Sequence, residues 1–564
     1  MGRWFEQYPE RLEHELQALR DSGFDPQVDG VARSQGLICL IIKGPIEGKE
    51  HTLEVRFPPG YPYFPFQIFA PSLHLQRHQD PYSKALCFIA RIESEWRASD
   101  TAAQYLREQL PLILVSNKSE GLFAGEGQEG APVTPYFLYQ ADSVVLIGDW
   151  ELGPEQTHGR LQLSVERDSE ANVLVRGAVK QILDQNGNLI GELDTRLSRQ
   201  FQRPAAGRWV RLQARPKSNH PAELLREAEQ AWPALATPRF DNGKDILGIA
   251  FPDEVRYREW GNNWIFLIRE RAGGLKHRAH NQPKQLRVSL VRADHTGRSD
   301  LTARVPTLRS LENRHAAIFG LGALGSMVTW QLARAGVGRL SIVDCDFVNA
   351  GTTPRWIYGL SAAGRNKATV LFERLRAEYP LVEVNPIVTR LGNVYPTPAD
   401  ESVAMAIATA EVIVDCTVEK TVHHYLSSVA WERRVPYIWA SGTPGGWGGI
   451  VGRVTGRRDA GCWKCFLSQL LNKLIVEPEA EDSADVQMAG CDAPTFRGAG
   501  FDLDEISLMC ARLTAATLCG ESPGSYGNFA WDVATVNLRK DGRPIAPEWR
   551  TYPLFPSEDC DEHN

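Results

Sequence analysis

The fold of the C-terminal half is decided by HAAIFGLGALGS, residues 315–326. It begins with a mostly apolar run, which predicts a buried strand. The pattern G-x-G-x-x-G follows at once, at Gly320, Gly322 and Gly325. The run from Met327 to Ala335 then predicts a helix, and a short apolar run after it predicts the next strand. A strand, a glycine-rich turn, a helix and a second strand together predict a parallel α/β sheet.

The residues around this turn have the chemistry of a nucleotide site. Glycines here let the backbone approach a phosphate, and the N-terminus of the following helix favours negative charge. Asp344 follows Gly325 at the spacing of a ribose-binding carboxylate. Asp346 adds a second carboxylate, which suits Mg²⁺ because that ion prefers oxygen ligands. Arg355 and Lys367 suit the charge of a triphosphate.

The motif set GLGALGS, IVDCDFV (residues 342–348), Arg355 and GRNKA (residues 364–368) resembles a known family. It is similar to the adenylation domain of ubiquitin-activating E1 enzymes and of bacterial ThiF and MoeB proteins, over most of residues 310–540. The resemblance implies that the domain binds ATP and Mg²⁺ and adenylates the C-terminal glycine of a protein substrate.

The resemblance also implies a role for each residue by position: the ribose is held by Asp344, the metal region is served by Asp346, and the phosphates are bound by Arg355 and Lys367. One departure concerns the metal. The family has an Asp-Asn pair after Asp-Cys-Thr, whereas here Asp415-Cys416-Thr417 is followed by Val418-Glu419. Asp415 and Glu419 are therefore the candidates to substitute, and the metal ligands stay unassigned.

Cys491 is the first candidate nucleophile. A thiolate is a strong nucleophile near neutral pH, so a nearby cysteine can take an adenylated carboxylate as a thioester. Cys491 lies in GCDAPTFRGAG, residues 490–500, a polar loop before a helical run from Leu503. The E1 family carries its catalytic cysteine in a comparable loop, which implies that role for Cys491. Thr495 is a candidate to position the acyl group.

Cys462 and Cys465 form a C-x-x-C pair in the same part of the chain. A tetrahedral zinc site needs two further ligands. The cysteines downstream are Cys510 and Cys519, which lack that spacing, and Cys560 in the tail. The favoured interpretation is two unligated thiols, and a zinc site is the alternative.

Cys87 has a different setting. It follows FPPGYPYFPF, residues 57–66, whose four prolines exclude a regular helix or central strand. With Trp96 soon after, the region resembles the ubiquitin-conjugating E2 fold over roughly residues 5–110, which implies that Cys87 is a second catalytic cysteine. The family has His-Pro-Asn where this chain has His78-Gln79-Asp80. An ionised aspartate cannot donate a hydrogen bond to an oxyanion, so that role is unassigned.

We therefore expect a multidomain protein of the α/β and α+β classes. An E2-like (UBC) α+β domain is predicted for residues 1–118, a β-rich linker domain for residues 135–305, and a Rossmann-like E1/ThiF adenylation domain for residues 306–564. The middle part is assigned from apolar alternation at Leu161 and Leu163 and from the hairpin signal Asn186-Gly187. It contains no motif to which chemistry can be assigned.

An E2-like and an E1-like domain on one chain resemble the E2–E1 fusion proteins of bacterial CBASS anti-phage operons. The resemblance implies that the C-terminus of a cGAS-like nucleotidyltransferase is adenylated, passed from Cys491 to Cys87 and conjugated to an amine of a target protein. It also implies a homodimer through the E1-like domain. Two alternatives stay open: a ThiF/MoeB-type sulfur-carrier activating enzyme, and a non-catalytic scaffold with degenerate domains.

Composition limits the class of protein further. The formal net charge of −7 gives no support to a nucleic-acid binder. No apolar run approaches the roughly 18 residues of a membrane span, and the charged start lacks the apolar core of a signal peptide. Ten cysteines in 564 residues are too sparse for a disulfide scaffold. We expect a cytoplasmic protein with free thiols that contacts neither membrane nor nucleic acid directly.

Overall fold

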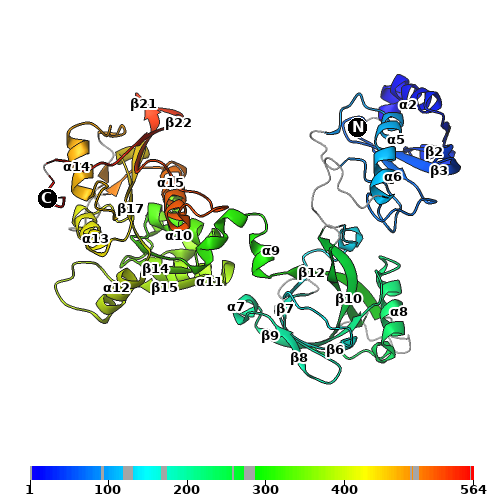
Figure 1. Cartoon of the computed structure of the whole chain (residues 1–564), viewed down its shortest axis with the longest axis horizontal. Helices are drawn as coiled ribbons and strands as arrows, with labels where there is room; N and C mark the ends of the chain where they lie inside the picture. The colour runs from blue at the N-terminus through cyan, green and yellow to red at the C-terminus, as the bar shows by residue number, and fades with distance from the viewer. Residues whose placement is uncertain are drawn as a thin grey trace. The chain divides into compact units, whose positions relative to one another are not determined.

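The computed structural model describes residues 3–89, 95–118, 131–166, 175–256, 259–271, 286–482, 485–486, 495–558 and 560–563. The chain divides into two compact units (Figure 1). One contains residues 1–194 and 201–296, and the other contains residues 195–200 and 297–564. Among the described helices, none combines the length and the apolar character that crossing a bilayer requires.

The first unit begins with an antiparallel four-stranded sheet in the order β1-β2-β3-β4. Helix α2 starts with proline at its first position and buries Leu12, Leu16 and Leu19, as its periodicity predicts. Helix α5 is capped by Thr101, whose side chain accepts a hydrogen bond from the backbone N–H of Gln104. The elements are α1 (Trp4–Gln7), α2 (Pro9–Asp21), β1 (Asp25–Val28), α3 (Gly30–Ser34), β2 (Ile38–Ile46), β3 (Lys49–Phe57), β4 (Gln67–Phe69), α5 (Ala102–Glu108) and α6 (Leu110–Lys118).

Glu15 joins three segments of this region. Its carboxylate is fully buried and accepts hydrogen bonds from Arg11 Nη2 (2.9 Å), from the backbone N–H of Ala102 (3.0 Å) and from the hydroxyl of Tyr61. Burial raises the pKa of Glu15, and the hydrogen bonds from Tyr61 and Ala102 oppose that rise. The carboxylate thus ties α2 to the proline-rich loop and to the start of α5.

The same unit continues into an eight-stranded sheet in the order β5-β12-β11-β10-β9-β6-β7-β8, and β5 also pairs with β7. This second pairing closes seven of the strands into a barrel. Leu161 and Leu163 are buried in its core together with Trp209 and Trp264, which confirms the predicted alternation. The elements are η1 (Thr134–Tyr136), β5 (Val144–Ile147), β6 (His158–Val165), β7 (Arg176–Leu183), β8 (Leu189–Glu192), β9 (Arg203–Arg211), α8 (Pro221–Ala231), η2 (Pro233–Ala236), β10 (Lys244–Arg256), β11 (Glu259–Arg271) and β12 (Leu286–His295).

The second unit is built on a sheet in the order β15-β14-β13-β16-β17-β18-β21-β22. The strands from β15 to β17 pair in parallel, and β18, β21 and β22 complete the sheet with antiparallel pairs. The strands are β13 (His315–Phe319), β14 (Arg339–Val343), β15 (Glu383–Ile387), β16 (Val412–Asp415), β17 (Tyr437–Gly442), β18 (Gly448–Val454), β21 (Val533–Lys540) and β22 (Arg543–Tyr552), with a separate pair β19 (Asp485–Val486) and β20 (Thr495–Phe496).

Helices cover both faces of this sheet (Figure 1). Alternate residues of β13 enter different cores: Ala316 and Ile318 pack with α10 and α15, whereas Ala317 and Phe319 pack with α12 and α13. The strand order reverses beside β13, so this is the doubly wound architecture that the sequence predicts. The helical elements are α7 (Thr195–Ser198), α9 (Arg298–Thr302), η3 (Pro306–Asn313), α10 (Ala323–Arg334), η4 (Ala350–Arg355), η5 (Leu360–Ala362), α11 (Lys367–Glu378), α12 (Pro398–Thr409), α13 (Lys420–Arg433), η6 (Pro444–Gly446), α14 (Trp463–Leu471) and α15 (Gly500–Cys519).

Replacement of the buried carboxylate tests how far it holds the first sheet's helices together. Glu15→Ala removes the acceptor of the Tyr61 hydroxyl and of the Ala102 N–H, which we expect to cost about 3 kcal/mol of local stability. In the full chain, hydrogen exchange of the α2 and α5 amides should then be faster. The exposed neighbour change Glu10→Ala is the control. Equal exchange in the two variants would contradict the central role of Glu15.

Candidate active site

The glycine turn after β13 is fixed by backbone packing. Gly320 has φ +79°, and a Cβ there would lie 2.7 Å from Thr417 Cα. A Cβ on Gly325 would lie 1.8 Å from the carbonyl oxygen of Gly320. Gly322 differs, since no described atom lies within 4 Å of a Cβ built on it. Two glycines are therefore needed to build the turn, and the third faces open space at the start of α10.

That open space has the properties of an anion site. Gly322 is the N-cap of α10, and among the described residues no side chain caps this end of the helix. The first N–H groups of a helix carry partial positive charge and can bind a phosphate. A glycine at the cap keeps a Cβ out of this space. The turn therefore suits the predicted nucleotide.

Asp344 stands at the end of β14 and is held by two backbone groups. Its Oδ2 accepts a hydrogen bond from Leu321 N (2.6 Å), and its Oδ1 accepts one from Asp346 N (2.7 Å). Burial raises the pKa of Asp344, while Lys367 and these N–H groups oppose the rise. The carboxylate thus connects the glycine turn to β14, at the position expected for a ribose ligand.

Asp346 and Lys367 form an ion pair beside Asp344. Lys367 Nζ lies 2.9 Å from Asp346 Oδ2, with the lysine mostly buried and the carboxylate exposed. Burial pushes the pKa of Asp346 up, but the hydrogen bond and charge of Lys367 hold it below its usual value. Oxygens of Asp344 and Asp346 lie within 4.8 Å of each other and of the Cys345 sulfur. Two carboxylates at this separation fit a Mg²⁺ ion.

Arg355 ends η4 and contacts the residues that follow the Cys491 segment. Its Nη1 donates to the carbonyl oxygen of Phe496 and its Nη2 to Thr495 Oγ1, both at 2.6 Å. Burial lowers the pKa of Arg355. Cys491 itself lies outside the described residues. The structure therefore ties the predicted phosphate ligand to the chain just after the predicted nucleophile.

Asp415 is enclosed at the end of β16. It is fully buried, and its Oδ1 accepts hydrogen bonds from Thr417 N (3.0 Å) and Thr417 Oγ1 (2.7 Å). Its Oδ2 accepts one from Tyr437 Oη (3.0 Å) and lies 3.0 Å from His423 Nδ1. The ring of His423 stacks on Trp463. These contacts give Asp415 a structural set of partners, while the other candidate, Glu419, is exposed.

Cys87 is exposed at the surface of the first unit. Its backbone N–H donates to the carbonyl oxygen of His78 (2.8 Å), which places the His-Gln-Asp motif beside it. Trp96 Nε1 donates to the carbonyl oxygen of Pro62 (3.0 Å), so the predicted tryptophan does contact the proline-rich loop. Asp80 accepts hydrogen bonds from the turn that follows it, including Tyr82 N (2.8 Å). The structure thus places His78 beside Cys87 and packs Trp96 on the proline-rich loop.

A second cysteine cluster lies at the start of α14. The potential ligand atoms of Cys462, Cys465, Cys560 and His563 all lie within 4.8 Å of one another. His563 Nδ1 is 3.1 Å from the carbonyl oxygen of Arg458, and its Nε2 is buried with no hydrogen-bond partner among the described atoms. Three thiols and an imidazole nitrogen fit tetrahedral Zn²⁺. Sequence analysis missed His563, although the spacing Cys560-x-x-His563 was available as a signal.

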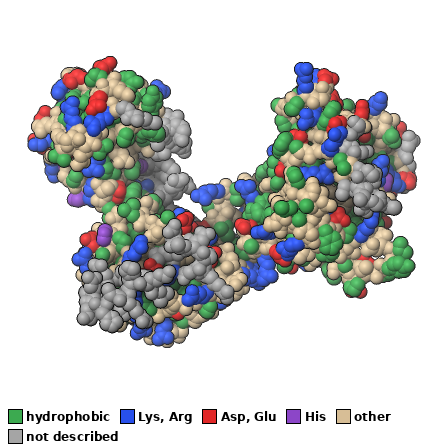
Figure 2. All heavy atoms as spheres, turned by 180° about the vertical axis from the view of Figure 1, so that it is seen from behind, with side chains coloured by type: hydrophobic (Ala, Val, Ile, Leu, Met, Phe, Trp, Pro, Cys, Tyr) green, Lys and Arg blue, Asp and Glu red, His purple; other side chains and the backbone are tan. Residues whose placement is uncertain are grey.

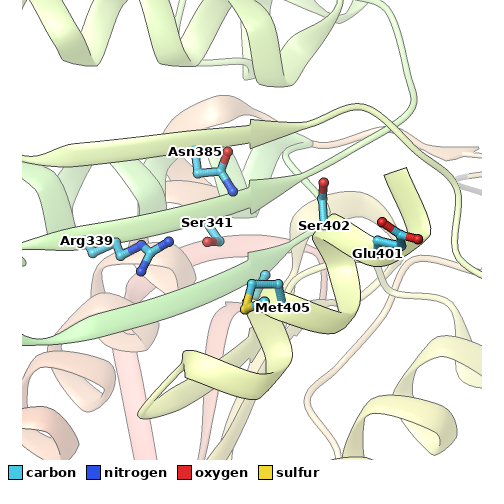
Figure 3. Close-up of a pocket in the computed structure, with 7 residues that line it drawn as sticks. Arg339, Ser341, Asn385, Glu401, Ser402 and Met405 are labelled. Carbon is cyan, nitrogen blue, oxygen red and sulfur yellow. The ribbon is translucent and has the colours of Figure 1, made fainter. Parts of the chain in front are cut away.

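A separate cavity of about 210 Å³ lies between the sheet and α12. Figure 3 shows Ser341 of β14 and Asn385 of β15 near Ser402 and Met405 of α12. Arg339, at the first position of β14, also lines it. Because the glycine turn lies at the other end of these strands, this cavity is distinct from the candidate nucleotide site.

Comparison with known families agrees with the geometry of the glycine turn. Residues 295–536 match the model of the ThiF family. The C-terminal part is a ThiF-family adenylation domain. The predicted Rossmann-like E1/ThiF fold is therefore confirmed for these residues. Adenylyltransferases of this family are enzymes that use ATP and Mg²⁺.

Relatives match over different shares of the chain. Protein y4oA of Sinorhizobium fredii is 28% identical and aligns with 99% of this chain and 97% of its own length. The molybdopterin-synthase adenylyltransferase of Salmonella typhimurium is 28% identical over 29% of this chain and 62% of its own. The ATP-dependent ubiquitin transferase-like protein Cap2 of Enterobacter hormaechei is 27% identical over 26% of this chain and 24% of its own.

Among solved structures, MccB of E. coli is 14% identical and has a TM-score of 0.35. The alignment spans 47% of this chain and 72% of the MccB chain.

Substitution in the glycine turn tests its role. Gly325→Ala places a methyl group against the Gly320 carbonyl, so we expect ATP affinity, measured by calorimetry, to fall at least about tenfold, together with a loss of domain stability. Gly322→Ala should leave thermal stability unchanged and weaken ATP binding alone, because its Cβ meets only the open space. Gly30→Ala, in the other unit, is the control. Unchanged ATP binding in both turn variants would place the nucleotide elsewhere.

Proposed function

We propose that the protein is an ATP-dependent ubiquitin-like transferase. It adenylates the C-terminal glycine of a protein, takes the acyl group onto Cys491, passes it to Cys87 and conjugates it to an amine. The observation that carries the proposal is an exposed cysteine, framed by E2-like sequence elements, on the same chain as a ThiF-family adenylation domain. A sulfur-carrier enzyme has no need of that second thiol.

The first step uses the candidate nucleotide site. The substrate carboxylate attacks the α-phosphorus of ATP, a carboxylate–phosphorus bond forms, and pyrophosphate leaves. Lys367 and Arg355 offset the charge of the phosphates, and Asp344 holds the ribose. When bound, Mg²⁺ would be held by Asp346 with Asp344 and would neutralise phosphate charge. These assignments rest on the ion pair and hydrogen bonds around Asp344.

The next steps are exchanges at one carbonyl carbon. The Cys491 thiolate attacks the adenylate, a thioester forms, and AMP leaves. The Cys87 thiolate then attacks this thioester, and Cys491 leaves as the thiolate. Finally an amine attacks the Cys87 thioester, an amide forms, Cys87 leaves as the thiolate, and the amine proton passes to solvent. Tethering both thiols on one chain raises the effective concentration of each toward the other.

Features of the first sheet support an E2-like role for residues 1–118. A helix precedes an antiparallel four-stranded meander, and a proline-rich loop packed on Trp96 comes before the cysteine. We propose a division into residues 1–118, 135–305 and 306–564, which the separate four-stranded sheet, barrel and parallel sheet support. The similarity to Cap2 supports the resemblance to CBASS fusion proteins and, through it, a cGAS-like nucleotidyltransferase as the activated protein.

The remaining expectations concern the oligomeric state of the protein, its location and its class of partner. We propose a homodimer formed by the adenylation domains, as the family resemblance implies. We place the protein in the cytoplasm, because its ten cysteines are too sparse for the disulfide scaffold of a small secreted domain. On the face shown in Figure 2, acidic and basic side chains are interspersed, which supports a protein partner rather than a nucleic acid.

We propose Zn²⁺ at Cys462, Cys465, Cys560 and His563 as the alternative to the interpretation of two unligated thiols. Bound there, it would fix the C-terminal tail to the start of α14. The pairing of Lys464 Nζ with Asp561 and Glu562, both at 2.9 Å, supports this connection. Donation of the His563 Nδ1–H to a carbonyl oxygen leaves Nε2 free to ligate.

The cysteine relay predicts three different outcomes in an assay with ATP, Mg²⁺ and a candidate protein that ends in glycine. The wild-type chain should form thiol-sensitive adducts and a thiol-resistant amide product. Cys87→Ala should keep an adduct on Cys491 and lose the amide, because the last acyl carrier is gone. Cys491→Ala should lose both adducts and keep pyrophosphate exchange into ATP. Peptide mass spectrometry locates each adduct.

The control for this assay is Cys39→Ala, which removes a buried thiol from β2 of the first sheet. Full conjugation by Cys87→Ala would disprove the relay. Product formation that needs sulfide or persulfide would favour the second candidate, a sulfur-carrier activating enzyme, which the similarity to molybdopterin-synthase adenylyltransferase supports. Absence of any pyrophosphate exchange with every candidate would favour the scaffold.

Metal content tests the thiol cluster separately. Protein purified without chelator should contain about one zinc per chain by plasma mass spectrometry, and His563→Ala and Cys560→Ala should lose most of it. Their C-terminal tails should also be cut faster by protease. His14→Ala, which removes an exposed histidine of the other unit, is the control. Zinc content equal in all variants would exclude this site.

A further inference from the structure

A hydroxyl from the segment that leads into the barrel lies beside Cys87. Tyr136 Oη is 3.8 Å from Cys87 Sγ, within hydrogen-bonding range for sulfur. Tyr136 ends the short helix η1, outside the region that resembles an E2 domain. Sequence analysis assigned no chemistry to this middle part of the chain. The Tyr136 hydroxyl nonetheless contacts Cys87 Sγ, the proposed reacting atom.

The barrel holds η1 from several directions. Asn219 Nδ2 donates to the carbonyl oxygen of Tyr136 (3.0 Å). Val133 N donates to Oδ2 of the fully buried Asp253 (2.9 Å). Tyr139 Oη donates to the carbonyl oxygen of Thr134 (2.9 Å). The position of the Tyr136 hydroxyl is therefore set by the barrel and not by the flexibility of a free linker.

The Cys87 side of the contact is held just as firmly. Tyr82 packs against the outer core of the barrel, with its ring 5.5 Å from that of Phe137, and its hydroxyl donates to the carbonyl oxygen of Pro216 (3.2 Å). Arg77 forms an ion pair with Glu254 of β10, and both side chains are mostly buried. The two sides of the Cys87–Tyr136 contact are therefore docked together.

The protonation states suit a donor hydroxyl. Burial raises the pKa of Tyr136 well above its usual range, so the phenol keeps its proton at neutral pH. Although Cys87 is exposed, desolvation by neighbouring atoms raises its pKa, the hydrogen bond with Tyr136 lowers it, and the charge of Asp80 raises it. Among the groups acting on this thiol, the tyrosine thus favours the thiolate.

The hydrogen-bond donor role that is unassigned at Asp80 of the His78-Gln79-Asp80 motif can be taken by the Tyr136 hydroxyl. Asp80 accepts hydrogen bonds from the backbone N–H groups of Tyr82 (2.8 Å) and Ser83 (3.2 Å), and an ionised carboxylate donates none. Gln79 is buried, with its amide bonded to backbone groups of Leu75 and Ala70. Asp80 and Gln79 are thus engaged with backbone groups, whereas the Tyr136 hydroxyl is a neutral donor in contact with Cys87.

We propose that Tyr136 is a catalytic residue that donates a hydrogen bond to the Cys87 thiolate, both as nucleophile and as leaving group. The proposal rests on the acyl-carrier role of Cys87 given above. During acyl transfer to Cys87, its Sγ–carbon bond forms while the Cys491 carbon–sulfur bond breaks. During aminolysis the nitrogen–carbon bond forms, the Cys87 carbon–sulfur bond breaks, and the amine proton passes to solvent. Tyr136 keeps its own proton throughout and stabilises the sulfur's negative charge.

The first test measures the thiol itself in the full chain. Tyr136→Phe keeps the ring and removes only the hydroxyl. The rate of Cys87 alkylation by iodoacetamide, followed by peptide mass spectrometry across pH, should shift to higher pH by about half a unit to one unit. The rate at pH 7 should then fall about three- to tenfold. Tyr63→Phe, an exposed tyrosine of the proline-rich loop, is the matched control and should leave the profile unchanged.

A second variant separates positioning from donation. Asn219→Ala keeps the Tyr136 hydroxyl but removes one support of η1. We therefore expect the alkylation profile to shift in the same direction by a smaller amount. A Tyr136→Phe profile that superimposes on the wild-type profile would overturn the proposal. Alkylation needs no acyl donor, so this result stands even if Cys87 proves to carry no acyl group. If the wild type does form a thioester at Cys87, an unchanged transfer rate in Tyr136→Phe would also overturn it.

Discussion

The close approach of the Gly320–Gly325 turn to the end of β16 is the constraint on which the nucleotide site depends. Backbone atoms fill the space that side chains would need at Gly320 and Gly325, so α10 begins directly beyond β13. The N–H of Leu321 then reaches Asp344 and joins the turn to β14. Three strand ends thus meet at one point, and residues far apart in the sequence become neighbours of a single phosphate-sized space.

The barrel changes the interpretation of the middle of the chain. A module with no recognisable motif would ordinarily be a spacer, yet it supplies the hydroxyl beside Cys87 and docks the loop that carries the thiol. The surroundings of this cysteine are therefore built from two folded modules that are separate in sequence. The adenylation domain, by contrast, builds its nucleotide site from its own strands and helices.

Local sequence signals predicted part of this structure well. Strand β13 (His315–Phe319) forms from the apolar run that precedes the glycine turn, and α2 forms where a proline is followed by Leu12, Leu16 and Leu19 on one face. Helix α10 begins at Ala323, earlier than the predicted Met327, because the turn itself starts the helix. Closure of the barrel through β5 and β7 has no local signal, and neither has the placement of Tyr136, since both arise from contacts between distant segments. The role of Cys491 stays a prediction.

An aromatic layer, formed by Trp463, Trp439, His423 and Tyr437, lies between the thiol cluster and β16 and can be followed by tryptophan fluorescence. Trp463 lies between the two cysteines of the C-x-x-C pair, stacks on His423 and meets Trp439 edge-on. His423 and Tyr437 contact Asp415, next to the strand end on which the glycine turn rests. Indole emission depends on nearby charge and rigidity, so these two tryptophans, among the 15 of the chain, are placed to respond to changes at the thiol cluster and at the end of β16.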